Sequence, residues 1–156
     1  ELGWCYADGV GVPKDLRHAA QAFQLAADQG FAAAQNNLGA LYYDGLGVPK
    51  DPVSSAKWFL RAAEQGHASA QCSLGSCYYD GYGVERNGKK AIYWYRKAAD
   101  QGVAVGMYCL GMCYETATGL EQRDIKQAIY WFRCAALQSH ALARDALKRL
   151  GADFNV

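Results

Sequence analysis

The sequence lacks an excess of charge of either sign and lacks any long hydrophobic run. Lys and Arg number 16 and Asp and Glu number 15, which gives a net charge of +1. Because a phosphate-binding surface needs clustered Lys and Arg, this balance argues against nucleic acid as a partner. No apolar run approaches the roughly 20 residues of a membrane-spanning helix, so we expect no membrane insertion. Hydrophobic residues make up 51% of the chain, which is enough for a packed core.

The sequence also lacks the motifs that hold metals, cofactors or phosphate groups. The three histidines, His18, His67 and His140, are scattered, and there is no Cys-x-x-Cys or His-x-x-x-His. A zinc site is therefore not expected. The glycine-rich segments lack the Gly-Lys-Ser/Thr of a phosphate cradle and the alternating oxygen ligands of a calcium loop. We predict no cofactor, no metal and no catalytic residue.

What the sequence does contain is a repeat with a period of 36 residues. The motif Leu-Gly-x-x-Tyr begins at residues 2, 38, 74 and 110, each start lying 36 residues after the last. A second motif, Ala-Ala-Asp/Glu-Gln-Gly, begins at residues 26, 62 and 98 and keeps the same step. Its fourth copy, Ala-Ala-Leu-Gln-Ser, begins at residue 135, one residue late. Self-similarity at a fixed period is typical of repeat architectures.

Each copy of the repeat predicts two helices. Leu38 and Tyr42 lie four residues apart and share one helical face, and Ala91, Tyr95 and Ala98 form a similar stripe in the second half. We call the first helix of a unit helix A and the second helix B. A glycine recurs in the middle of helix A, where it costs about 1 kcal/mol relative to Ala, so we expect helix B to approach closely there. These glycines are Gly39, Gly75 and Gly111.

The loop between the two helices predicts where helix B begins. Its second copy reads Asp-Gly-Leu-Gly-Val-Pro-Lys-Asp over residues 44–51. Two glycines permit positive φ angles, and the proline prevents a continuous helix. Asp15, Asp51 and Asn87 end the first three loops and should cap helix B. The fourth loop, residues 115–121, has lost the first glycine, so we expect its path to change.

These patterns predict an all-α solenoid of antiparallel helix pairs, because one isolated pair cannot bury its apolar stripes and must stack on its neighbours. We expect a single domain over residues 1–156. Its four units, its capping helix and its tail are predicted at residues 1–30, 31–66, 67–102, 103–139, 140–150 and 151–156. The first unit begins inside helix A, so we expect either a monomer or a fragment of a longer solenoid.

The motifs resemble the Sel-one-like repeat family, which is related to the tetratricopeptide repeats but has a longer loop between the helices. The resemblance rests on Leu-Gly-x-x-Tyr, Asp-Gly-x-Gly-Val and Ala-Ala-Asp/Glu-Gln-Gly in register, and it covers essentially the whole chain. The fourth loop and Ser55, where Ala is usual, depart from the family pattern. The resemblance implies a right-handed α/α superhelix and a scaffold or adaptor in a protein complex.

We therefore expect a non-enzymatic scaffold that binds a protein or peptide. If the units stack like tetratricopeptide repeats, helix A lines the concave face, which would hold few positive charges. Trp58, Trp94 and Trp131 on helix B are expected in the core between units. The residues that we expect to contact a partner are Trp4, Asn36, Ala40, Tyr43, Ser76, Tyr79, Tyr108, Met112, Glu115 and Arg149.

Two other functions stay open. The six cysteines leave room for a thiol-dependent or hydrolase-like enzyme. A nucleophile such as Cys72 or Cys109 would need a positioned His and an oxyanion site, and no motif supplies them. The other alternative is a purely structural spacer whose end unit stacks on a second copy of the chain.

The cysteines themselves are expected to be free. Cys5, Cys77 and Cys113 occupy one repeat position, which behaves as a buried apolar slot. Stacking would place successive members of this column about 10 Å apart, beyond the roughly 7 Å limit for a disulfide. Cys109 and Cys113 lie four apart on one helix, which suits a bridge poorly. A cysteine-rich subgroup of the family carries a disulfide in each repeat, but its regular pairs are absent here. Free thiols favour a reducing compartment and leave the periplasm or a lumen open.

Overall fold

The structure of the chain, a computed structural model, describes residues 3, 7 and 15–153. All regular secondary structure within 15–153 is α-helical, so the all-α prediction is confirmed. None of the helices described there is long and apolar enough to cross a membrane. The helices are α2 (Leu16–Asp28), α3 (Ala32–Asp44), α4 (Pro52–Glu64), α5 (Ala68–Asp80), α6 (Gly88–Asp100), α7 (Ala104–Thr116), α8 (Ile125–Leu137) and α9 (Ala141–Arg149).

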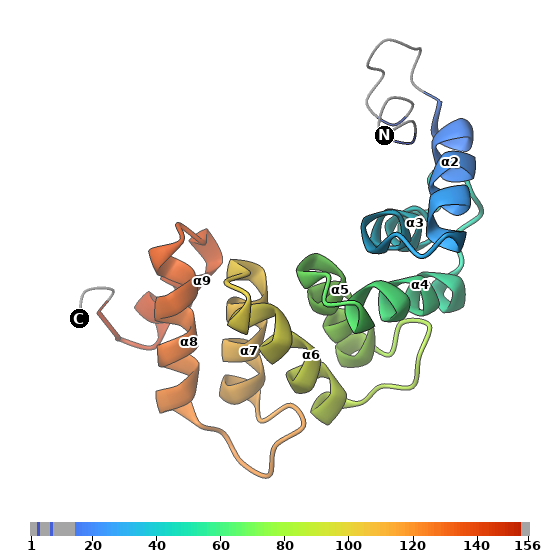
Figure 1. Ribbon diagram of the computed structural model, residues 1–156. Helices are drawn as coiled ribbons and strands as arrows, with labels where there is room; N and C mark the ends of the chain where they lie inside the picture. Colours follow the sequence, from blue (N-terminus) through green and yellow to red (C-terminus); the bar gives the residue numbers. More distant parts are fainter. Residues whose placement is uncertain (1–2, 4–6, 8–14, 154–156) are drawn as a thin grey trace.

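The helices form a curved row of pairs, which opens between α2 and α9 (Figure 1). Helix A and helix B of the second, third and fourth units are α3 with α4, α5 with α6, and α7 with α8. Each pair also packs against the next, through α2 and α3, α4 and α5, and α6 and α7. The row then ends on α9, which packs against α8. Successive units therefore share their interiors, as in a solenoid.

The glycines of helix A allow an aromatic ring of helix B to lie against the helix backbone. A Cβ atom at Gly75 would lie 2.6 Å from Tyr95 Cδ1, and one at Gly111 would lie 2.7 Å from Phe132 Cδ1. Gly39 is covered by an aromatic ring in the same way. The close approach predicted at these positions is confirmed, and the group that makes it is a ring of helix B.

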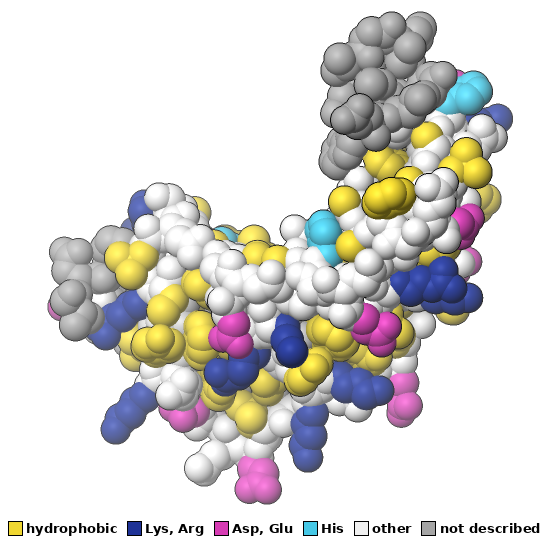
Figure 2. All heavy atoms as spheres, in the orientation of Figure 1, with side chains coloured by type: hydrophobic (Ala, Val, Ile, Leu, Met, Phe, Trp, Pro, Cys, Tyr) yellow, Lys and Arg dark blue, Asp and Glu magenta, His cyan; other side chains and the backbone are white. Residues whose placement is uncertain are grey.

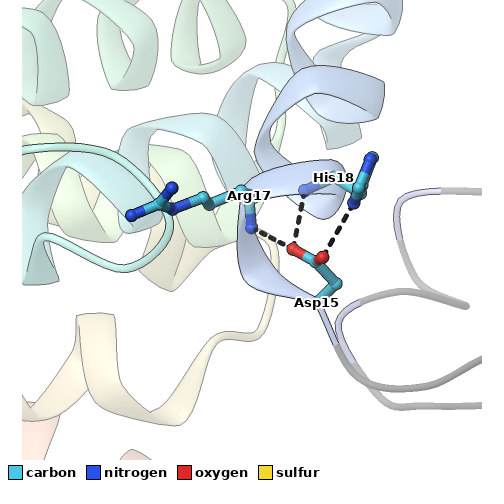
Figure 3. Close-up of polar contacts among 3 residues, drawn as sticks. All are labelled: Asp15, Arg17 and His18. Carbon is cyan, nitrogen blue, oxygen red and sulfur yellow. Dashed lines mark hydrogen bonds and ion pairs between the residues drawn. The ribbon is translucent and has the colours of Figure 1, made fainter.

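Side-chain caps begin helix B where the sequence predicted them. Oδ1 of Asp15 accepts hydrogen bonds from the backbone N–H of Arg17 (2.9 Å) and of His18 (3.1 Å), as Figure 3 shows. Oδ2 of the same carboxylate lies 2.8 Å from Nδ1 of His18, and these bonds hold the pKa of Asp15 below its usual value. Asp51 and Asn87 accept from the first-turn N–H groups of α4 and α6.

The tryptophans of helix B lie between units, as predicted. Trp58 of α4 packs in the cluster formed by α2 and α3, and Trp131 of α8 packs in the cluster formed by α6 and α7. Both are 8% exposed. Trp94 of α6 packs against the cluster of α4 and α5. Each ring thus packs at the junction between its own unit and the preceding one.

Buried glutamines make a polar link between successive units. Nε2 of Gln71 donates to the carbonyl of Ala63 (3.2 Å), while Oε1 of Gln71 accepts from Gln101 (2.7 Å). Gln35 and Gln65 make the same 2.7 Å bond one unit earlier. The pair Gln71 and Gln101 lies 36 residues after the pair Gln35 and Gln65, so the link belongs to the repeat. It was not foreseen from the motifs.

The fourth loop keeps more of the repeat path than its sequence suggested. A Cβ atom at Gly83 would clash with the backbone of Pro52, and one at Gly119 would clash with the backbone of Gly88. Both glycines have positive φ, 71° and 73°. The loop therefore still touches the preceding unit at the same place, and the extra residue falls between Gly119 and the cap of α8, Asp124.

Candidate protein-binding surface

One cavity recurs at two successive junctions between units. The first has a volume of about 300 Å³ and lies between α3, α4 and α5; the second has a volume of about 240 Å³ and lies between α5, α6 and α7. The first is lined by Ala40, Tyr43, Asp44, Phe59, Ser73 and Ser76. The second is lined by Tyr79, Asp80, Tyr95, Tyr108, Cys109 and Met112.

The two cavities are built from equivalent residues. Five lining positions of the second lie 36 residues after five lining positions of the first. In each, a Tyr-Asp pair ends one helix A, a ring of helix B forms the floor, and the next helix A supplies the far wall. Three larger cavities do not form such a pair: two, of about 580 and 650 Å³, lie beside α2, and one of about 340 Å³ is lined by residues of α4, α5 and α6.

At the first cavity, the ring of Tyr43 is 38% exposed and meets the following loop. Its centroid lies 4.5 Å from that of Tyr82, whose hydroxyl donates to the carbonyl of Tyr43 (3.0 Å). Nζ of Lys50 lies 5.8 Å and 5.5 Å from the two ring centroids. Partial burial raises the pKa of Tyr43, so its hydroxyl remains a neutral donor at physiological pH.

At the second cavity, Tyr108 is held on two sides. Its ring stacks on His140 with a centroid distance of 4.8 Å and lies 5.7 Å from Phe132. Below it, the hydroxyl of Tyr95 donates to Oγ of Ser76 (3.0 Å). Burial raises the pKa of Tyr95 well above its usual value, so this group is also a neutral phenol.

An ion pair between Glu115 of α7 and Arg149 of α9 lies at the C-terminal end of the row of helices A. Nη1 and Nη2 of Arg149 donate to the two carboxylate oxygens of Glu115, at 2.6 and 2.9 Å. Glu115 lies on α7 and Arg149 on α9, so the pair ties the last unit to the capping helix. Both side chains were predicted to contact a partner, and here each already satisfies the charge of the other.

The structure brings together six of the predicted contact residues at the two cavities. Asn36 is half-buried on α3 and lines neither cavity, and Trp4 lies outside the described residues. The sequence did not predict that Phe59 and Tyr95 of helix B would line the cavities, nor that Asp44 and Asp80 would. The available signal was the recurrence of Asp directly after the second Tyr of helix A. The six residues are Ala40, Tyr43, Ser76, Tyr79, Tyr108 and Met112.

The described cysteines are all free thiols. Cys77 and Cys113 are fully buried, which confirms the apolar slot, and burial raises their pKa values to about 11 and about 12. Cys5 lies outside the described residues. Residues 15–153 hold no group of three or more His, Cys, Asp or Glu side chains arranged to bind a metal ion.

The stacked helix pairs and the recurrent cavities define a class of protein: an α/α solenoid built from short tandem repeats. The model of the Sel1 repeat matches the chain four times, over residues 1–31, 32–67, 68–103 and 104–140. The chain belongs to the Sel1 repeat family. Members of this family are generally non-enzymatic scaffolds for protein interactions. No curated protein sequence matches the chain.

Solved structures of repeat proteins are similar to this chain. A Sel1 repeat protein from Oxalobacter formigenes is 37% identical, with a TM-score of 0.83 over 90% of this chain. The protein c5321, a protective antigen of uropathogenic Escherichia coli strains with an SLR fold, is 38% identical, with a TM-score of 0.90 over 97% of this chain. The chain spans 58% and 33% of the lengths of these two proteins.

A third structure supports the fold alone. The cysteine rich protein B of Helicobacter pylori is 22% identical and has a TM-score of 0.65 over 86% of this chain and 96% of its own. The Sel-one-like repeat resemblance stated from the motifs is thus confirmed, and with it the solenoid.

Proposed function

We propose that this chain is a non-enzymatic scaffold that binds an extended segment of a protein or a peptide along α3, α5 and α7. The observation that carries the proposal is the recurrence of one cavity, with equivalent lining positions, at two successive junctions. Directly packed helices lie about 8–10 Å apart, and an extended chain advances about 3.3 Å per residue. A peptide lying along the row would therefore need at least about three residues to pass from one cavity to the next.

The position of the cavities supports this proposal. In Figure 1, α3, α5 and α7 lie nearer the opening of the curve than α4 and α6. Figure 2 shows that the inner edge of the curve carries mainly hydrophobic and uncharged side chains, whereas Lys and Arg on this face lie across its middle and along the outer edge. A weakly charged inner surface suits contacts with apolar side chains and the polypeptide backbone better than it suits carboxylate capture.

The tyrosines give this surface its binding groups. Tyr43, Tyr79 and Tyr108 each present a ring beside a cavity and a hydroxyl that can bond to a peptide backbone. Aromatic side chains of this kind carry much of the binding energy at protein interfaces because they bury large areas at small entropic cost. Met112 adds a flexible apolar wall to the second cavity.

The experiment begins by selecting ligands for the folded chain from a random peptide library and measuring their affinity by calorimetry. Tyr79→Ala and Tyr108→Ala should each weaken binding by at least tenfold, or about 1.4 kcal/mol. The matched controls are Tyr93→Ala on α6 and Tyr130→Ala on α8, whose side chains are 53% and 55% exposed. Both controls should bind as the unaltered chain does. Loss of affinity in the control variants alone, or the absence of any selected peptide, would reject the proposed surface.

A further inference from the structure

The second cavity differs chemically from the first because it contains a pair of thiols. Cys72 on α5 and Cys109 on α7 lie in the core cluster shared by the third and fourth units, where their side chains are close enough to act on each other electrostatically. Cys72 is 9% exposed, whereas Cys109 is half-buried and lines the cavity. The hydroxyl of Tyr95 donates to Ser76 Oγ (3.0 Å), and the Tyr95 side chain lies beside Cys109 in the lining of the cavity.

Packing of the repeat does not require these groups. The preceding junction forms an equivalent cavity and an equivalent contact between helix A and helix B. The residues of that junction that lie 36 positions before Cys72, Tyr95 and Cys109 carry neither a sulfur atom nor a phenol group. These residues are Asn36, Phe59 and Ser73. The thiol pair and its hydroxyl are thus particular to the junction between the third and fourth units.

We propose that Cys109 and Cys72 form a two-thiol oxidation site, which hydroperoxides such as hydrogen peroxide convert into a disulfide between α5 and α7. Cys72 and Cys109 are 37 residues apart, one more than the period, so they do not occupy equivalent positions of the repeat. The oxidation site is independent of the proposed binding function.

The surroundings assign a different role to each sulfur. The Cys72 side chain, and to a smaller extent the Tyr95 hydroxyl, lowers the pKa of Cys109 despite its burial and the nearby carboxylate of Asp80. The neighbouring Cys109 side chain and burial both raise the pKa of Cys72. The thiolate is the reactive form of cysteine. Cys109 is therefore the sulfur that attacks the peroxide, and Cys72 remains a thiol beside it.

The reaction has two balanced steps. In the first, the Cys109 thiolate attacks one peroxide oxygen, the O–O bond breaks, and the departing hydroxide takes a proton from solvent to become water. Cys109 is then a sulfenic acid. In the second, the Cys72 sulfur attacks the Cys109 sulfur, the S–O bond breaks, and the hydroxide leaves as water with the Cys72 proton. Two thiols are oxidised to one disulfide, and one peroxide is reduced to two waters.

The test exposes the reduced chain to one equivalent of hydrogen peroxide, alkylates the remaining thiols and measures the intact mass. The chain has six cysteines, so we expect four alkylated thiols in a monomer that has lost two hydrogen atoms. Without reduction, trypsin should release residues 62–86 joined to residues 98–123. Fragmentation of the joined peptides should place the bond between Cys72 and Cys109. Six alkylated thiols, a bond that involves Cys134, or a bond between Cys77 and Cys113 would overturn the proposal.

Variants separate the two roles. Cys72→Ser should stop at a sulfenic acid on Cys109 that dimedone traps, and Cys109→Ser should slow the loss of thiols by roughly tenfold or more. Cys77→Ala is the matched control, because it lies on α5 and should leave the disulfide unchanged. A disulfide that forms at the same rate without Cys109 would contradict the assignment. Mapping of the unaltered chain decides the matter even if a variant does not fold.

Discussion

In the third unit, helix A is capped by Gly81 and helix B is followed by Gly102, both with positive φ. In the fourth unit the same places are taken by Ala117, with φ 59°, and Ser139, with φ 64°. Residues other than glycine pay a steric cost in this left-handed conformation. The backbone of the fourth unit nevertheless turns as the third does. The turn is thus imposed by the packing around it, and glycine makes it easier without being its cause.

The polar link between units also weakens at the fourth unit. Met107 stands where Gln71 stands one unit earlier, and Nε2 of Gln138 reaches only its sulfur, at 3.6 Å. The contact between helix A and helix B is by contrast kept, with Gly111 beneath Phe132 as Gly75 is beneath Tyr95. Between the third and fourth units, the contact of the helix-A glycine with the helix-B ring is retained, whereas the residues at the helix ends and the polar link differ.

The largest expected effect comes from breaking the retained contact. Gly75→Val and Gly111→Val should each destabilise the chain by about 3 kcal/mol, because the new side chain overlaps the helix-B ring. Urea unfolding followed by circular dichroism measures the change. Ser69→Val, at an exposed position on α5, is the control and should stay within about 0.5 kcal/mol. A much smaller loss at Gly111 than at Gly75 would show that the contact is not equally needed in the two units.

The next effect comes from exchanging the polar links. Gln71→Met should cost about 1–2 kcal/mol, because the carbonyl of Ala63 and the side chain of Gln101 lose a partner. The reciprocal change, Met107→Gln, should gain up to about 1 kcal/mol by giving Gln138 an oxygen acceptor. The same unfolding measurement serves both. If both variants lose stability equally, the difference between the units does not lie in this bond.

Smaller shifts are expected at the helix ends. Ser139→Gly and Ala117→Gly should each stabilise the chain by about 0.5–1 kcal/mol, since glycine adopts positive φ without a steric cost. Gly66→Ala in the second unit should cost a similar amount. A Cβ at Gly66 would meet no atom within 4 Å, so only the backbone angle is tested there. A destabilised Ser139→Gly would mean that its side chain contributes more than the strain costs.

The smallest effect distinguishes the units by pH. Nδ1 of His67 accepts a hydrogen bond from the N–H of Ala70 (3.3 Å) at the start of α5, whereas Val103 offers no side-chain cap to α7. Burial lowers the pKa of His67. With the folded pKa below the unfolded value near 6.5, this cap stabilises above pH 6.5 and is lost as pH falls through the folded pKa.

The measurement for this cap is the stability to urea at pH 7.5 and at pH 5. His67→Asn keeps an oxygen acceptor that does not titrate, so part of the loss at pH 5 should disappear. Val103→Ala, at the start of α7, is the control and should leave the pH dependence unchanged. An identical pH dependence in His67→Asn and in the unaltered chain would remove His67 as a source of it.

The features that could be predicted are those that depend on spacing along one helix or one loop. The caps at Asp15 and Asp51, the glycines of helix A and the tryptophans between units all follow from periodicity, because each has a fixed place in a helical repeat. The contact residues predicted on helix A stay a prediction, although several of them, Tyr43 and Tyr79 among others, line the two cavities.

The features that could not be predicted join residues from different units. The pairing of Glu115 with Arg149 spans 34 residues and depends on the angle at which α9 packs. The thiol pair of Cys72 and Cys109 is one residue out of register, so a comparison of equivalent positions does not bring it together. Periodicity indicates which residues are equivalent, whereas side-chain reach decides which residues touch.

The most direct test of the account is a crosslinking map of a peptide selected on the folded chain. A photoreactive side chain is placed in turn at Ala40, Ser76 and Met112 beside the cavities, and at Tyr93 and Tyr130 on helix B. The account predicts that the peptide crosslinks at the first three positions, in consecutive order along its sequence, and at neither helix-B position. Crosslinks at Tyr93 or Tyr130, with none at the cavity positions, would contradict it.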